Sequence, residues 1–274
     1  MAQEEKDYVL GTHDEEIARL GLQHAVWRPR ATAAWRRAGF TAGQTLVDLG
    51  CGPGWATFDL ADIVGRQGRV VAIDRSRRFL DTLERSARAR GATQIEVHEQ
   101  DLAAGALPVI GADGLWSRWI FAFVPGPRDL LARAVAALRP GGTFVSHEYA
   151  DYRGWQIFPH SPEFESFVNE VMASWRATGG EPNIGMHLPG WLEELGVEVT
   201  SLAPLADVAR PRDHVWQWPT AFIETGIARL VELGRIDAKR GRAIADAYAH
   251  MAATPHAFQI TPMVMEIVGV KRDA

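Results

Sequence analysis

Val47-Asp48-Leu49-Gly50-Cys51-Gly52-Pro53-Gly54 is the stretch of the chain that decides its fold. It joins a short apolar strand, expected over 45–50, to a helix expected over about 55–64. The three glycines let the backbone turn sharply and approach a ligand closely, because glycine has no Cβ. Asp48 lies near the end of the strand, where its carboxylate can accept hydrogen bonds from a cationic amine. The stretch therefore predicts a ligand-binding loop between a strand and a helix.

Strands and helices alternate after this loop. The apolar patterns predict strands over 69–74, 94–98, 114–117 and 143–149, and helices over 76–90 and 127–138. Nearly continuous apolar strands that alternate with helices are typical of a parallel sheet covered on both faces. Ligands of such sheets bind beyond the carboxyl ends of the strands. We therefore expect an α/β, doubly wound fold with its site at that edge.

Helical patterns precede the alternation and later interrupt it. Thr12 and Glu15 form a capping box, which predicts a helix from about His13, and Pro29 is expected to end that helix or open the next. Residues 1–40 should form N-terminal lid helices over the carboxyl edge of the sheet. Residues 41–274 should be the main domain, with helical insertions at about 152–186 and 209–257, a short helix around 189–195, and strands over 197–202 and 261–270.

The composition of the chain argues against several classes of function. The 274 residues have a formal net charge of −5, and this acidic balance argues against nucleic acid as a partner. Cys51 is the single cysteine, which excludes a disulfide framework and fits a reducing compartment. Residues 1–7 are polar, unlike a signal peptide, and no apolar run approaches the roughly 18–20 residues that span a bilayer. We expect a cytoplasmic protein without a membrane partner; whether it forms a homodimer is left open.

Two further acids follow predicted strands. Asp74 ends the second strand, twenty residues after Gly54, where a carboxylate can bind both hydroxyls of a ribose. Asp101 follows the third strand, from which it could reach an adenine amino group. Together with the glycine loop, these acids point to a ligand that contains a nucleoside.

The chain resembles the class I S-adenosylmethionine-dependent methyltransferases, of the type that act on small molecules. The resemblance covers about residues 40–151. It rests on Asp48-Leu49-Gly50-Cys51-Gly52-Pro53-Gly54, Val71-Ala72-Ile73-Asp74, Gln100-Asp101-Leu102 and Leu138-Arg139-Pro140-Gly141-Gly142, in this order. It implies a Rossmann-like, mostly parallel seven-stranded sheet with its last strand antiparallel, and S-adenosylmethionine as cofactor. Ser117-Arg118-Trp119-Ile120-Phe121 stands where the family lines the methionine moiety. The expected cofactor-binding residues are Asp48, Gly50, Cys51, Gly52, Gly54, Asp74, Arg75, Asp101, Leu102 and Arg118.

Two alternative functions fit the sequence less well. A nicotinamide dinucleotide site of an NAD(P)-dependent oxidoreductase favours G-x-G-x-x-G, but Trp55 stands where the third glycine would be. Such a loop faces a pyrophosphate anion, which has no use for an acid at position 48. A non-catalytic regulator that binds S-adenosylmethionine is a further alternative. Residues 116–124 hold no carboxylate, and the chain has no H-E-x-x-H, so we expect no metal.

Aromatic residues gather in the lid and at the sheet edge. They favour a flat apolar pocket for an aromatic methyl acceptor, although Trp175 in its regular helical stripe fits core packing better. We expect methyl transfer to an oxygen or nitrogen atom of a small, partly aromatic metabolite. The expected substrate-binding residues are Trp119, Phe123, Tyr149 and Tyr152.

The strand over 143–149 should end beside the transferred methyl group. Alternation puts His147 and Tyr149 on one face of the strand and Glu148 on the other. His147 titrates near neutrality and is the hypothetical general base if the acceptor is a hydroxyl. For Glu148, a role as a structural hydrogen-bond acceptor is equally consistent with the sequence.

Overall fold

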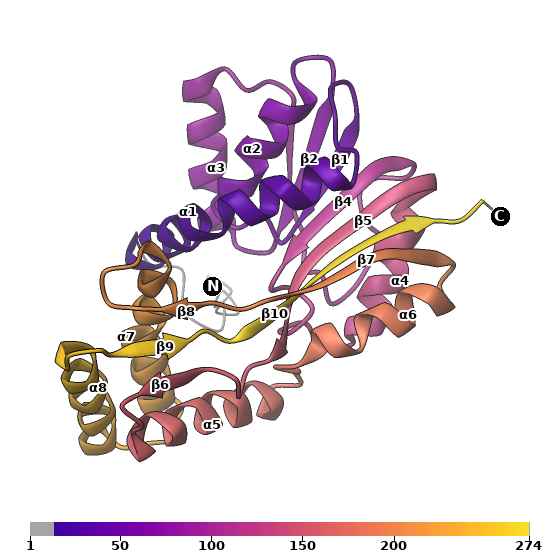
Figure 1. The fold of residues 1–274 in the computed structure, drawn as a ribbon. Coiled ribbons are helices and arrows are strands. Elements are labelled where there is room, and N and C mark those ends of the chain that lie inside the picture. The colour runs from indigo at the N-terminus through magenta and orange to yellow at the C-terminus, as the bar shows by residue number, and fades with distance from the viewer. Residues whose placement is uncertain (1–13, 274) are drawn as a thin grey trace, which may run out of the picture.

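The computed structural model describes residues 14–273 and has a seven-stranded sheet at its centre (Figure 1). The strand order is β3-β2-β1-β4-β5-β10-β7. The strands are β1 (Thr45–Leu49), β2 (Arg69–Asp74), β3 (Ile95–Glu99), β4 (Ala112–Arg118), β5 (Leu138–Asp151), β7 (Val197–Leu205) and β10 (Met263–Lys271). β1 to β5 run parallel, whereas β10 is antiparallel to both of its neighbours, β5 and β7. This topology confirms the predicted Rossmann-like methyltransferase fold.

Helices cover both faces of the sheet. Because side chains alternate along a strand, Leu46 and Val47 belong to different hydrophobic clusters. The cluster of Leu46 includes residues of α1 (Asp14–Arg37) and α2 (Trp55–Val64), whereas that of Val47 includes residues of α4 (Pro127–Ala137) and α6 (Leu188–Glu194). α4 ends one residue before the predicted boundary, and β5 begins at Leu138, earlier than predicted.

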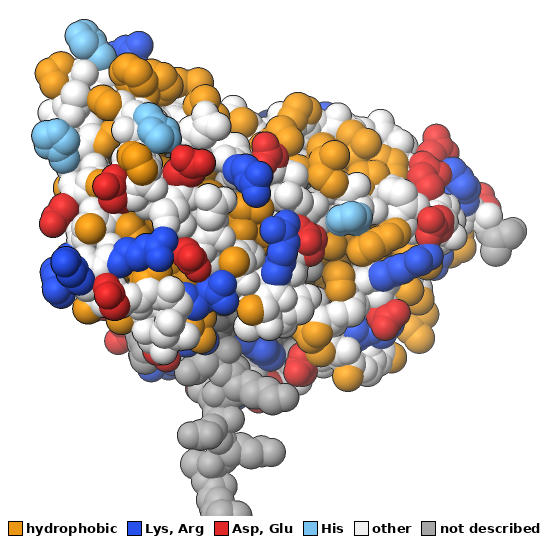
Figure 2. Space-filling model, turned by 90° about the horizontal axis from the view of Figure 1, so that it is seen from below, with side chains coloured by type: hydrophobic (Ala, Val, Ile, Leu, Met, Phe, Trp, Pro, Cys, Tyr) orange, Lys and Arg blue, Asp and Glu red, His pale blue; other side chains and the backbone are white. Residues whose placement is uncertain are grey.

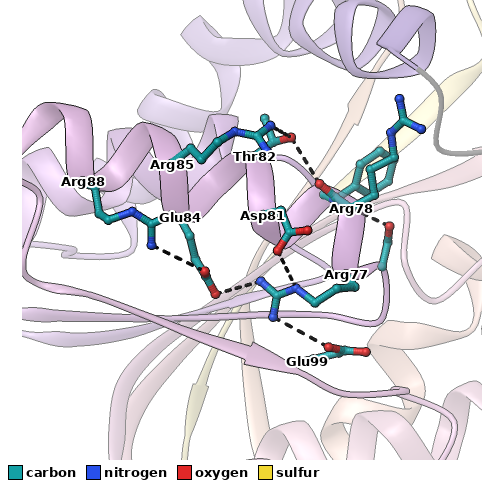
Figure 3. A network of polar contacts seen from close by, with 10 residues as sticks. Arg77, Arg78, Asp81, Thr82, Glu84, Arg85, Arg88 and Glu99 are labelled. Carbon is teal, nitrogen blue, oxygen red and sulfur yellow. Dashed lines mark hydrogen bonds and ion pairs between the residues drawn. The ribbon is translucent and has the colours of Figure 1, made fainter.

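The helix α3 (Arg77–Arg90) packs beside the outer strands β2 and β3. Its start is capped by Ser76, whose hydroxyl accepts a hydrogen bond from the backbone, and it ends at left-handed Gly91. On the outward face, Arg77 bonds Glu84 at 2.7 Å and lies 3.6 Å from Glu99 (Figure 3). Exposed pairs of this kind contribute about 0–1 kcal/mol each, so the buried apolar face of α3 holds it in place.

The N-terminal helix differs from the prediction. α1 is one continuous helix that contains Pro29, so the predicted break at this proline is wrong. Trp27 and Ala31 on either side are fully buried, and this burial offsets the roughly 3 kcal/mol that an interior proline costs. The predicted capping box and the start at His13 involve residues outside the described part of the chain.

The two insertions form a helical layer with a small sheet. They contain α5 (Pro162–Ala177), α7 (Gln217–Glu232) and α8 (Ala238–Ala253), which lie together beside one end of the main sheet (Figure 1). The second sheet, β6 (Gln156–Phe158), β9 (Phe258–Ile260) and β8 (Val208–Ala209), was not predicted. Its order β6-β9-β8 matches the order β5-β10-β7 in the main sheet. The reason is that β6 follows β5, β9 precedes β10 and β8 follows β7 in the chain. Among residues 14–273, no helix is long and apolar enough to cross a bilayer.

Candidate active site

The glycine loop after β1 has three residues with positive φ. A Cβ on Gly50 would lie 1.9 Å from the end of the Ile120 side chain, and one on Gly54 would lie 2.3 Å from that of Leu83, so these side chains would have to shift, and the positive φ of both positions further favours glycine. Gly52 differs, because its φ is +53° and the nearest atom to its added Cβ would be 4.0 Å away. Gly52 also lines a cavity. It therefore keeps the backbone open toward a ligand.

Asp74, at the end of β2, closes this loop. Its Oδ2 accepts a hydrogen bond from the backbone N–H of Gly52 at 2.8 Å, and its Oδ1 accepts one from Ser76 at 2.9 Å. Burial raises the pKa of Asp74, and these hydrogen bonds oppose the rise. A carboxylate has about four lone-pair positions, so acceptor capacity remains for a diol in the adjoining cavities.

Asp48 lies in β1, one position before the strand ends. Its side chain is 2% exposed and accepts a hydrogen bond from the Thr57 hydroxyl at 2.6 Å. Burial raises the pKa of Asp48 to about 6, while the hydrogen bond from Thr57 and the charge of Arg118 lower it. A cation in this cavity would favour the ionised form further.

Arg118, at the end of β4, provides the cation of the site. Its guanidinium lies 5.9 Å from the ring of Trp116 and 5.2 Å from that of Trp119. Nη2 is 3.2 Å from Nδ1 of His24, whose Nε2 is 3.0 Å from Asp59. Nη1 is buried without a hydrogen-bond partner among the described residues. Burial lowers the pKa of Arg118 to about 10, so it stays charged near neutrality and fits a ligand carboxylate.

His24 is a site residue that the sequence did not single out. Arg118 is a donor only, so Nδ1 of His24 accepts, and Nε2 carries the proton toward Asp59. Burial lowers the pKa of His24, which is consistent with this neutral form. Helix α1 thereby holds the arginine of the site.

Three neighbouring cavities lie at the carboxyl ends of the strands. The first, of about 620 Å³, includes Asp48, Gly50, Cys51, Gly52, Asp74 and Arg118 in its lining. The second, of about 570 Å³, includes Gly50, Asp74, Arg75, Asp101 and Leu102. Of the expected cofactor-binding residues, Gly54 alone lines neither of them, since it packs against Leu83.

The third cavity, of about 460 Å³, is aromatic. All four expected substrate-binding residues line it: Trp119, Phe123, Tyr149 and Tyr152. Trp175 lines it too, although its spacing had favoured core packing, and so do Trp155, Trp218 and Phe222 from the insertions. The insertions thus contribute aromatic side chains to this cavity, and their role as a lid stays a prediction.

Trp119 lies where the three cavities meet, because it lines each of them. Its ring stacks on Tyr149 at 5.4 Å and on Trp218 at 5.5 Å. Its backbone has a φ of +54°, which is uncommon for a bulky residue and tends to occur at functional sites. Its Nε1 is buried without a hydrogen-bond partner among the described residues.

His147 and Glu148 lie at the end of β5 but line none of the three cavities. His147 is fully buried, its Nε2 is 3.1 Å from Glu266, and burial lowers its pKa. In this conformation it cannot reach a bound acceptor, so the geometry does not support the base hypothesis, which stays a prediction. Glu148 accepts hydrogen bonds from the backbone of Ile120 and Phe121, which is the structural role considered for it.

The part of the chain that the structure describes contains no cluster of three or more His, Cys, Asp or Glu side chains suited to a metal ion.

Comparison with known proteins identifies the central domain. A family model described as a methyltransferase domain matches residues 46–142. A 37.1 kDa protein of transposon Tn4556 from Streptomyces fradiae is 27% identical over 81% of this chain and 62% of its own. The aklanonic acid methyltransferase DauC of Streptomyces sp. (strain C5) is 30% identical over 47% of this chain and 59% of its own. The matches thus span less than two thirds of either relative.

Solved structures agree with this comparison at the level of the fold. A structure from Bacillus halodurans C-125, described as that of a methyltransferase candidate, has a TM-score of 0.60 at 15% identity, covering 88% of this chain and 98% of the other. Coclaurine N-methyltransferase, bound to N-methylheliamine and SAH (S-adenosylhomocysteine), has a TM-score of 0.52 at 15% identity, covering 86% and 70%.

Proposed function

Because the chain belongs to the class I S-adenosylmethionine-dependent methyltransferases, with S-adenosylmethionine as cofactor, we propose that it methylates an oxygen or nitrogen atom of a small aromatic molecule. The observation that carries the proposal is the meeting of three cavities at Trp119. Two are lined by acids and glycine, together with Arg118 in the first and Arg75 in the second, and the third is lined mostly by aromatic rings. A donor and an acceptor bound in them would be neighbours, which is the main requirement of an in-line transfer.

The residues present fit the cofactor. The open space at the Cα of Gly52 would let the cofactor approach the backbone, and the spare acceptor capacity of Asp74 would bind its ribose. Nη1 of Arg118, which has no hydrogen-bond partner among the described residues, would bind its carboxylate. Asp48 would balance its ammonium group. When bound, S-adenosylmethionine supplies a methyl group activated by the sulfonium. The chain contributes orientation, and the aromatic rings exclude water from the transfer.

Small-molecule acceptors are favoured by two further observations. Aklanonic acid methyltransferase, by its name, acts on a small organic acid, and it is one of the relatives. On the face shown in Figure 2, basic and acidic side chains intermix with apolar ones, which is unlike the basic stripe that nucleic acid requires. We also propose that the protein acts in the cytoplasm, as its single cysteine suggests.

A two-step experiment tests the proposal. Calorimetry with SAH should detect binding in the micromolar range, about −8 kcal/mol. Incubation with S-adenosylmethionine and a library of phenols, amines and carboxylic acids should then release SAH with at least one acceptor, as seen by mass spectrometry. Binding of SAH without turnover on any acceptor would favour the non-catalytic regulator. Binding of NADH in place of SAH would favour the oxidoreductase.

A further inference from the structure

The aromatic cavity combines rings from several distant parts of the chain. Eight of the twelve described residues that line it are aromatic. They come from the segment after β4, from the end of β5 and the residues that follow it, and from α5 and α7. The six tyrosines and tryptophans are Trp119, Tyr149, Tyr152, Trp155, Trp175 and Trp218.

Among the described residues that line the cavity, Arg19 is the charged one, and its charge is balanced. Nε and Nη2 of Arg19 donate to the two carboxylate oxygens of Glu16 at 2.7 and 2.6 Å, and Nη1 donates to Gln23 at 3.1 Å. Glu16 is itself 4% exposed, so solvent screens the pair little. The paired arginine therefore neither attracts an anionic acceptor strongly nor repels a cation strongly.

Residues that could act as a base are also scarce here. None of the described residues that line the cavity is an Asp, Glu or His. Burial raises the pKa of Tyr152 well above its ordinary value, so its phenol stays protonated near neutrality. A hydroxyl acceptor usually needs a group that takes its proton, whereas a neutral amine does not. The lining thus suits an acceptor with a lone pair that is already available.

We propose that the aromatic cavity selects an amine: an uncharged nitrogen on an apolar or aromatic scaffold that becomes a substituted ammonium ion on methylation. The inference rests on the proposed function and names the substrate class of the same site. Aromatic rings attract cations through their quadrupole, with about 0.5–2 kcal/mol per favourable contact. The aromatic rings of this cavity, whose described lining has no free carboxylate, therefore stabilise the positive charge that develops on nitrogen.

The transfer balances without any further reactant. The lone pair of the amine nitrogen forms the new N–C bond to the methyl carbon, and the C–S bond breaks with its electron pair left on sulfur. The positive charge passes from sulfur to nitrogen, and no proton moves in this step. A primary or secondary amine then loses its N–H proton to water, whereas a tertiary amine leaves as a quaternary ammonium ion.

Binding of three probes to the SAH-saturated protein tests the preference for a cation. The probes are 4-hydroxyphenyltrimethylammonium, its neutral isostere 4-tert-butylphenol and the anion 4-hydroxybenzoate, measured by calorimetry at pH 7. The cation should bind about tenfold more tightly than the neutral isostere, and the anion most weakly. Equal affinity for the cation and the isostere, or tightest binding of the anion, would overturn the proposal.

Two variants of Tyr152 locate the effect in the rings. Tyr152→Phe keeps the ring and should keep the cation-to-isostere ratio, whereas Tyr152→Leu removes the ring and should lower the ratio several-fold. An unchanged ratio in the leucine variant contradicts a role for the rings. If Tyr152→Leu does not fold, Phe222→Leu on α7, in the same cavity, gives the same comparison. Loss of SAH binding in the parent protein would refute the proposed function, whereas normal SAH binding without a cation preference refutes this inference alone.

Discussion

Replacing Glu148 with glutamine should change how the stability of the protein depends on pH. Oε1 of this fully buried side chain accepts hydrogen bonds from the backbone N–H groups of Ile120 and Phe121 at 2.7 and 3.0 Å. Oε2 is buried without a hydrogen-bond partner in the described chain. Burial raises the pKa of Glu148 to about 8, while the backbone hydrogen bonds lower it. Ionisation of Glu148 in the folded protein is therefore unfavourable below about pH 8.

The direction of the effect follows from proton binding. Between its ordinary pKa of 4.5 and about 8, folded Glu148 holds a proton that the unfolded chain has lost, so the free energy of unfolding falls as pH rises. His24 and His147 act oppositely below their ordinary pKa of 6.5, because burial lowers their pKa and the unfolded chain binds the extra protons. Above pH 6.5 these histidine contributions fade, and what remains cancels when the parent protein is compared with Glu148→Gln. At about 1.4 kcal/mol per pH unit, the loss that Glu148 causes from pH 6.5 to 8 is about 2 kcal/mol.

Urea unfolding at half-unit steps from pH 6.5 to 8 measures this loss. The parent protein should lose about 2 kcal/mol more than Glu148→Gln across the range, because the amide cannot ionise but keeps an oxygen for Ile120 and Phe121. Glu224→Gln, at an exposed position on α7, is the matched control and should follow the parent. Parallel pH profiles for the parent and Glu148→Gln would refute the reasoning, since they would mean that Glu148 is charged throughout.

Three other substitutions probe the site. Asp74→Ala should weaken SAH binding by roughly 1–3 kcal/mol, about 5- to 150-fold, because it removes a charged acceptor from the cavity; unchanged affinity in calorimetry would exclude Asp74 from the cofactor site. Gly52→Ala and Gly43→Ala both place alanine at positive φ and should each cost roughly 1–2 kcal/mol of stability. Only Gly52→Ala should also weaken SAH binding, by tenfold or more; equal affinities for the two variants would contradict the open position of Gly52. His147→Ala tests the base hypothesis. Because His147 is fully buried, we expect the variant to have a lower melting temperature and an unchanged pH profile of the single-turnover rate. A 10²- to 10⁴-fold loss of rate that depends on pH would instead establish His147 as a base.

The donor half of the site could be predicted from sequence because its parts are local. Asp48, Gly52 and Asp74 each end or follow a buried strand, and parallel strands bring their carboxyl ends to one edge. Once the alternation of strands and helices is recognised, these side chains must be neighbours. The predicted helix break at Pro29 is wrong because burial of Trp27 and Ala31 offsets the free energy that an interior proline costs, and only the folded contacts reveal this burial.

The acceptor half depends on contacts that no local pattern contains. Trp119 packs between Tyr149 of β5 and Trp218 of α7, and Trp27 of α1 meets both tryptophans edge-on at 5.2 and 4.8 Å. Each of these side chains is compatible with ordinary core packing when considered alone. Trp119 differs from an ordinary core residue in its left-handed backbone and in lining all three cavities at once. In the proposed reaction, the residues that contact the acceptor therefore come from the ends of β4 and β5 as well as from α1 and the insertions. The choice of acceptor then depends on how these distant segments pack together, whereas the proposed donor site depends on the glycine loop and its acids.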